Sequence, residues 1–130
     1  MLGRAPFLRT LFALCGLGHL IVGILGTAWP RWFFAAAPPW PPLHIGQIQI
    51  GGIFDLAMAT AFLIAGTDVQ RYAGLMTPVG VVAEGGHALV RIGHVIAGDN
   101  PPADLFLPSL MATVAIVLAI AGVQRRAGRA

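Results

Sequence analysis

Four long, predominantly apolar runs follow one another along the chain. They cover residues 11–29, 44–66, 74–97 and 103–123, with charged or proline-rich segments between them. A helix of about 20 apolar residues crosses a hydrocarbon layer roughly 30 Å thick. The pattern therefore predicts an all-α protein, an integral membrane four-helix bundle that forms a single transmembrane domain over residues 1–130.

The first run also has features of a signal peptide. Arg4 and Arg9 precede it, and the small residues Gly26, Thr27 and Ala28 lie near its end. Its apolar part is longer than the usual signal core of about 7–15 residues. We therefore predict a membrane helix for residues 11–29.

Prolines and tryptophans mark the connections between the runs. We expect Pro78 and Pro108 in the first turns of the third and fourth helices, where a backbone N–H has no partner within the helix. Residues 29–42 hold all three tryptophans and five of the ten prolines. Proline blocks a long helix, and tryptophan favours the headgroup level of a membrane. This segment is predicted to lie on the outer surface, either as a plain aromatic belt or as a lid.

Arginine supplies every basic charge, and its distribution predicts the orientation of the helices. Cytoplasmic loops of membrane proteins carry an excess of Lys and Arg. With both termini cytoplasmic, only Arg31 lies on the outer side. The inner side then holds Arg4, Arg9, Arg71, Arg125, Arg126 and Arg129. The sequence thus predicts a multi-pass protein of the bacterial cytoplasmic (inner) membrane, with both termini inside.

Composition narrows the class of protein further. Apolar residues make up 57% of the chain and charged residues 10%, whereas a soluble domain carries about 25% charged residues. This balance excludes an ordinary soluble enzyme, a disordered chain and a coiled coil. The net charge of +3 comes from arginines at the ends of the runs rather than from a basic face, so we expect no nucleic-acid partner.

Polar and small residues inside the runs fall on narrow helical faces, because a helix advances by about 100° per residue. The stripe of the third run consists of Glu84, His87, Arg91 and His94. That of the second run consists of His44, Gln47, Gly51, Asp55 and Met58. The first run has a face of small residues that suits close contact with another helix, formed by Cys15, Gly16, His19, Gly23, Gly26 and Thr27.

The cost of placing charge in a membrane predicts where these stripes face. A charged side chain at the centre of a membrane helix costs roughly 2.5–3.5 kcal/mol. Asp55, Glu84 and Arg91 should therefore face the bundle interior, with Arg91 paired to a carboxylate of another helix or to a ligand. Together they describe a polar funnel that opens outwards, and its predicted ligand-binding residues are His19, Gln47, Asp55, Glu84, His87, Arg91 and His94. The sequence leaves two interpretations of these residues open: a charge network that only fixes helix packing, and a binding or proton-relay site.

Metal and cofactor chemistry is less defined. The spacing Glu84-x-x-His87 occurs in diiron four-helix proteins, which need two such motifs and two further glutamates. Glu84 is the single glutamate of the chain, so we predict no diiron site and assign no metal or cofactor. A single ion held by His19, Asp55, Glu84 and His87, or a haem between His19 and His87, stays open.

Two segments carry a resemblance to a known family. Gly51-Gly-Ile-Phe-Asp55-Leu-Ala and Glu84-Gly-Gly-His-Ala-Leu-Val-Arg91-Ile-Gly-His-Val-Ile-Ala-Gly-Asp99-Asn-Pro resemble the small four-helix bacterial membrane proteins of the DoxX-like group. The resemblance implies a four-helix bundle, which in some members serves beside redox enzymes that deliver electrons to quinone. His87 and His94 match no pattern of this family.

These features lead to two functional expectations. The first is a non-catalytic accessory subunit or small-ligand binder of a quinone-linked redox complex, because polar groups converge without a nucleophile or a phosphate loop. Its partners would be the lipid bilayer, a membrane protein and a small apolar or quinone-like ligand. The alternative is an intramembrane acid–base enzyme, an isomerase or cyclase of a lipid-soluble substrate, with Asp55 or Glu84 moving the proton.

Overall fold

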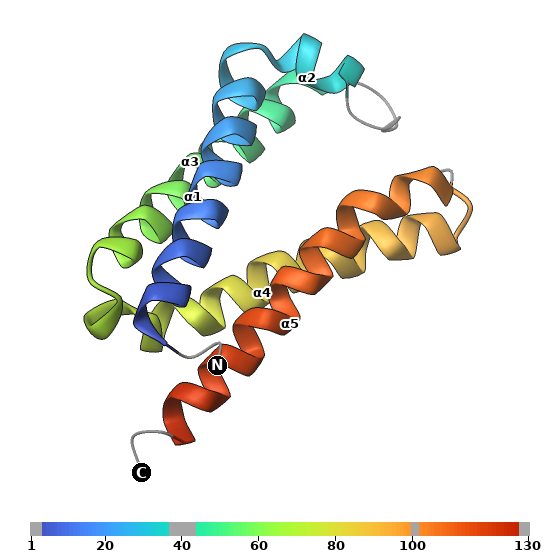
Figure 1. The fold of residues 1–130 in the computed structure, drawn as a ribbon. Coiled ribbons are helices and arrows are strands. Elements are labelled where there is room, and N and C mark those ends of the chain that lie inside the picture. The colour runs from blue at the N-terminus through green and yellow to red at the C-terminus, as the bar shows by residue number, and fades with distance from the viewer. Residues whose placement is uncertain (1–3, 37–43, 100–101, 128–130) are drawn as a thin grey trace. The chain divides into compact units, whose positions relative to one another are not determined.

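The computed structural model describes residues 4–36, 44–99 and 102–127, and the described residues form helices and no strands. The elements are α1 (Ala5–Ala28), α2 (Pro30–Ala36), α3 (Ile45–Thr67), α4 (Val69–Ile96), the short 3-10 helix η1 (Pro102–Leu105) and α5 (Phe106–Ala127) (Figure 1). The all-α prediction is thereby confirmed.

Three of the long helices, α1, α3 and α5, are long and apolar enough to cross a membrane. The chain is therefore consistent with a multi-pass membrane protein. The fourth long helix, α4, has 28 residues but is not among the three. It is less apolar because it carries Arg71, Glu84 and Arg91 together with two histidines, His87 and His94.

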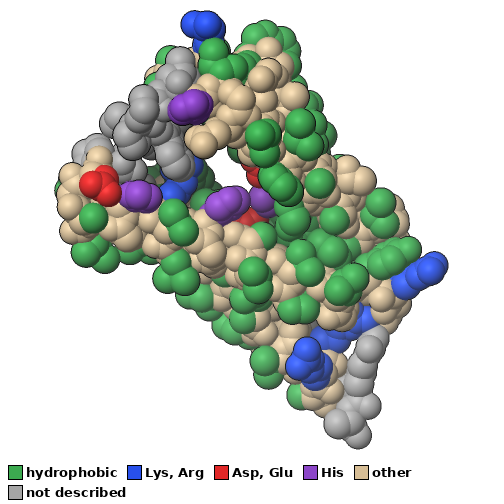
Figure 2. Space-filling view, turned by 180° about the vertical axis from the view of Figure 1, so that it is seen from behind, with side chains coloured by type: hydrophobic (Ala, Val, Ile, Leu, Met, Phe, Trp, Pro, Cys, Tyr) green, Lys and Arg blue, Asp and Glu red, His purple; other side chains and the backbone are tan. Residues whose placement is uncertain are grey.

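The chain divides into two compact units. One comprises residues 9–68 and contains α2, α3 and most of α1; the other comprises residues 69–130 with the first eight residues and contains α4, η1 and α5. In each unit two long helices lie side by side and run antiparallel (Figure 1). Hydrophobic side chains are spread over the face drawn in Figure 2.

Glycines bring α1 and α3 into backbone contact. A Cβ atom added to Gly23 would lie 2.9 Å from the carbonyl oxygen of Gly52, and one added to Gly52 would lie 3.0 Å from that of Gly23. In each glycine a hydrogen occupies this position, so the two backbones come within reach of Cα–H···O contacts. Such Cα–H···O contacts recur where helices approach closely. The small-residue face predicted for the first run is the face on which α1 meets α3.

Small residues also line the contact of α4 with α5. The methyl Cγ2 of the buried Thr77 lies against Gly122, 2.9 Å from the position of an added Cβ. Further along the pair, Ala115 faces Gly85. At the other end, Arg125 Nη2 donates a hydrogen bond to the carbonyl oxygen of Gln70 at 2.7 Å. Arginine near a helix C-terminus is also favourable for the helix dipole.

Several helix boundaries differ from the predicted ones. The second helix agrees to within one residue, but α1 begins at Ala5 rather than residue 11 and α4 begins at Val69 rather than residue 74. The prediction that Pro78 lies in the first turns of its helix is therefore wrong, since Pro78 lies inside α4. Counting apolar residues missed the polar first turn of α4, which follows Asp68, a residue type preferred before a helix. Pro108 does lie in the first turn of α5.

The segment rich in tryptophan and proline begins with a short helix. Pro30 has no backbone N–H and cannot donate to the carbonyl oxygen of Gly26, so α1 ends at Ala28. The backbone N–H of Phe33 then bonds to the carbonyl oxygen of Trp29, and α2 continues to Ala36. The rest of the predicted segment, residues 37–42, lies outside the described residues.

Candidate functional site

The centre of the unit formed by residues 9–68 holds a histidine–aspartate pair. His19 lies on α1 and Asp55 on α3, and the distance between Nδ1 of His19 and Oδ1 of Asp55 is 2.7 Å. The His19 side chain is 7% exposed and that of Asp55 18% exposed. Both residues lie near the middle of helices that are long enough to span a membrane.

The local sequence explains why these two side chains meet. His19 lies four residues before Gly23 on the small-residue face of α1, and Asp55 lies three residues after Gly52 on α3. The backbone contact between these glycines holds the two helices close enough for an imidazole and a carboxylate to bond directly. The sequence analysis placed both residues in one site, and the structure pairs them.

Phe62 of α3 also contacts His19. Its ring stacks on the imidazole, with centroids 5.8 Å apart and an angle of 15° between the planes. It also contacts Phe12 of α1, with centroids 5.9 Å apart, and both phenylalanines are fully buried. Aromatic packing fixes the orientation of the imidazole, while Asp55 bonds to its Nδ1 edge. Sequence analysis missed Phe62, although it lies two helical turns after Asp55.

The remaining predicted site residues of α4 differ in exposure. Glu84 is 6% exposed and lies between the buried residues Gly80 and Ala88 on the same face of the helix. His87, one turn later, is exposed, and Arg91 is half-buried. The sequence analysis also predicts that Glu84, His87 and Arg91 meet His19 and Asp55. These side chains belong to different units, so their meeting stays a prediction.

His94 pairs with a residue that the sequence analysis did not assign to it. Its Nδ1 lies 2.9 Å from Oδ2 of Asp99, and the two side chains are 47% and 59% exposed. The pair lies at the C-terminal end of α4, next to Gly98, which has a φ of +83°. The N–H of Gly98 bonds to the carbonyl oxygen of Val95, and that of Asp99 to that of His94. This is the glycine-dependent end that many helices share, so His94 has a structural role there.

The two predicted residues at the start of α3 lie on its surface. His44 precedes α3 and Gln47 lies in its first turn, and both side chains are exposed. The neighbouring Gln49 instead reaches α1, where its Nε2 donates to the carbonyl oxygen of Thr27 at 3.3 Å. The structure therefore does not bring His44 or Gln47 onto the His19–Asp55 pair.

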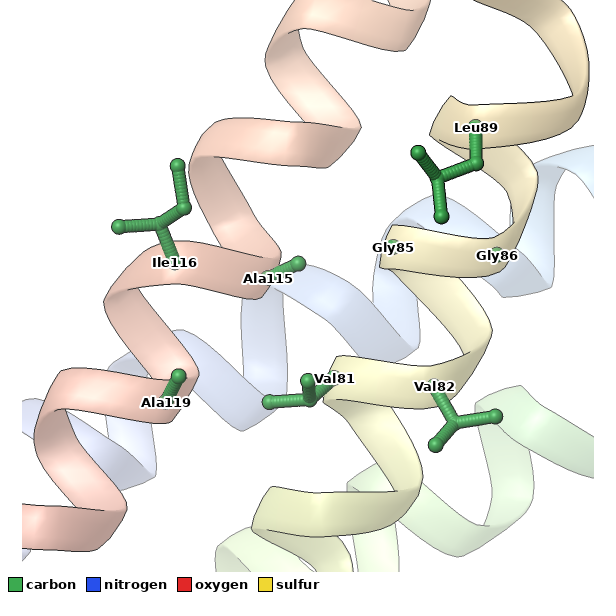
Figure 3. Close-up of a pocket in the computed structure, with 8 residues that line it drawn as sticks. All are labelled: Val81, Val82, Gly85, Gly86, Leu89, Ala115, Ile116 and Ala119. Carbon is green, nitrogen blue, oxygen red and sulfur yellow. The ribbon is translucent and has the colours of Figure 1, made fainter.

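An open groove of about 470 Å³ lies between α4 and α5. Its lining is entirely apolar or glycine (Figure 3) and consists of Val81, Val82, Gly85, Gly86, Leu89, Ala115, Ile116 and Ala119. None of these side chains can donate a hydrogen bond, accept a proton or attack a substrate. The chemistry of the chain therefore lies outside this groove.

A metal site would require several His, Cys, Asp or Glu side chains close together. Among the side chains that the structure describes, no three of His, Cys, Asp or Glu gather closely enough to hold a metal ion. His19 and Asp55 provide two donor groups, whereas a structural zinc site uses four. The one cysteine, Cys15, is buried on the small-residue face of α1.

Comparison with known proteins returned no match, whether with family models, curated proteins or solved structures. The resemblance to the DoxX-like group therefore rests on the two quoted segments alone. Gly52 and Asp55, both in the first segment, make the helix contact and the bond to His19 in the unit formed by residues 9–68.

Proposed function

We propose that this protein is a non-catalytic accessory subunit or small-ligand binder of the bacterial cytoplasmic membrane, with a binding site built on the His19–Asp55 pair. The carrying observation is the 2.7 Å contact between these side chains in the middle of two membrane-length helices. Ionisable groups at such a depth are costly to insert and are a mark of functional sites.

The proposed ligand is a small apolar molecule with a hydrogen-bonding group, such as a quinone. Imidazole accepts or donates a hydrogen bond according to its tautomer, and a carboxylate on one ring nitrogen selects that tautomer. With the ring proton on the Nδ1 that faces Asp55, Nε2 accepts a hydrogen bond. The hydroxyl of a reduced quinone (a quinol) can donate that bond, and its isoprenoid tail is soluble in the lipid around α1 and α3. This chemistry supports service beside a quinone-linked redox partner.

Binding can be measured with decylubiquinol, the reduced form of decylubiquinone, as the probe and the purified protein in mild detergent. We expect His19→Gln and Asp55→Asn to weaken binding about tenfold, which corresponds to the loss of one well-formed hydrogen bond. His94→Gln is the matched control, because His94 has the same partner type at an exposed position. Equal affinities in all four proteins would contradict a quinone site at His19.

A second function is favoured by the same pair. A histidine oriented by a carboxylate is the arrangement of a general base, so an isomerase or cyclase of a lipid-soluble substrate would use His19 as base and Asp55 as its positioning residue. In the binding experiment this enzyme would reveal itself by conversion of a co-purified lipid, detected by mass spectrometry and abolished in Asp55→Asn. A visible spectrum of the same sample would reveal a haem.

The proposed topology is a four-helix bundle in which all four long helices cross the membrane with both termini cytoplasmic. Its support is the excess of arginine on one side. An alkaline phosphatase fusion is active outside the cytoplasm, so we expect activity for a fusion after Gly98 and none after Asp68 or at the C-terminus. Equal activities after Asp68 and Gly98 would show that α4 does not cross, and a periplasmic C-terminus would reverse the orientation.

A further inference from the structure

A cleft lies where α1 ends and α3 begins. It has a volume of about 370 Å³ and is lined by Ala28, Trp29, Pro30, Arg31, Trp32 and Ile45. Ala28 is the last residue of α1 and Ile45 the first of α3. Because both helices are candidate membrane spans, the cleft lies at the depth where hydrocarbon gives way to headgroups.

The two indoles of the cleft are unusually exposed for such large side chains. Trp29 is 58% exposed and Trp32 60% exposed, and no residue of α2 is buried. Indole combines an apolar body with an N–H donor, so it is most stable where one end is apolar and the other is wet. A short helix with exposed aromatic side chains at the end of a span is suited to the membrane interface.

Arg31 adds a charge to this apolar cleft. Its guanidinium is exposed and makes no hydrogen bond or ion pair with any other described residue. Five of the six lining residues are apolar. The cleft therefore offers a cation that binds phosphate through several N–H donors beside a surface that excludes water.

We propose that this cleft holds the headgroup of one phospholipid, with its phosphate on Arg31 and its glycerol and first acyl carbons against Trp29 and Trp32. A phospholipid carries a phosphate and apolar chains in one molecule, so it can contact Arg31 and the apolar lining at the same time. A free phosphate ion has no apolar part and can contact Arg31 alone. Arg31 would donate to the phosphate oxygens, and the indole N–H groups could donate to phosphate or ester oxygens. The proposal does not depend on the His19–Asp55 site.

Native mass spectrometry in mild detergent tests this proposal with added phosphatidylglycerol as the probe. We expect the lipid concentration for half-saturation to rise about tenfold in Arg31→Gln and in Trp32→Ala, and to recover largely in Arg31→Lys. Arg126→Gln is the matched control, because Arg126 is exposed in the last turn of α5. An unchanged circular dichroism spectrum and elution volume establish that each variant is folded.

Two further probes identify the ligand. Diacylglycerol with the same acyl chains should bind at least about tenfold more weakly than phosphatidylglycerol, and millimolar inorganic phosphate should not displace the lipid. Equal binding of diacylglycerol would overturn recognition of the phosphate, and displacement by inorganic phosphate would assign the cleft to a free anion. Equal weakening in Arg31→Gln and Arg126→Gln would reduce the effect to general attraction between cation and lipid.

Discussion

Replacing Gly52 by alanine is expected to destabilise the contact between α1 and α3 by about 1–3 kcal/mol, the usual cost of overpacking. The new Cβ would lie 2.6 Å from Oγ1 of Thr27, 2.8 Å from its backbone nitrogen and 3.0 Å from the carbonyl oxygen of Gly23. Two of these three atoms belong to the backbone, so the helices must move apart. The measurement is the free energy of unfolding in mixed detergent and dodecyl sulfate, followed by circular dichroism.

The adjacent glycine provides the matched control for this prediction. A Cβ on Gly51 would meet nothing within 4 Å, so Gly51→Ala should be neutral or stabilising by up to about 1 kcal/mol, through helix propensity. A second pair repeats the test on α1, where Gly23→Ala meets Leu56 and Gly52 while Gly18→Ala meets nothing within 4 Å. Equal effects at Gly51 and Gly52 would refute the backbone contact.

Removing one partner of the His19–Asp55 pair should cost more than removing both. His19→Phe keeps a planar ring against Phe62 but leaves the half-buried Asp55 carboxylate without its imidazole. Breaking a fully buried pair in this way costs about 3–5 kcal/mol, so we expect a loss of at most about 3 kcal/mol here. The double variant His19→Phe, Asp55→Leu removes the charge as well and should regain most of this stability, because apolar replacement of a buried ion pair is often neutral. The same unfolding measurement gives the four free energies of the cycle.

The exposed pair at the end of α4 is the control for this cycle. His94 and Asp99 are 2.9 Å apart, close to the 2.7 Å of the buried pair, but are 47% and 59% exposed. Exposed ion pairs typically contribute about 0.2–1 kcal/mol. A coupling at His19–Asp55 no larger than that at His94–Asp99 would assign the buried pair no energetic role in the contact between α1 and α3.

Helical periodicity and the cost of buried charge explain what sequence reasoning could reach. The spacing of Cys15, Gly16, His19, Gly23 and Gly26 predicted a face for close helix contact, and the structure packs α3 on it. The cost of a carboxylate in a membrane predicted that Asp55 turns away from lipid, and the structure gives it His19 as a partner. Both inferences concern only the contact between one helix and the helix packed against it.

Features that depend on local backbone geometry were harder to predict. The start of α4 is set by a polar turn after Asp68 rather than by apolar residues, which is why Pro78 was misplaced. The pairing of His94 with Asp99 follows from the chain reversal at Gly98, whereas projection onto a straight helix put His94 on a stripe with Glu84. The stacking of Phe62 on His19 requires knowledge of which α3 residues face α1.

The glycine contact and the ion pair between α1 and α3 bear on the order in which this protein is made. A ribosome completes α1 before α3, so His19 reaches the bilayer before Asp55 does. When α3 follows, Asp55 carries an insertion cost of roughly 2.5–3.5 kcal/mol, and its partner is already present on a helix that α3 can approach to backbone contact. Synthesis in the reverse order would present the translocon with the unpaired acid first.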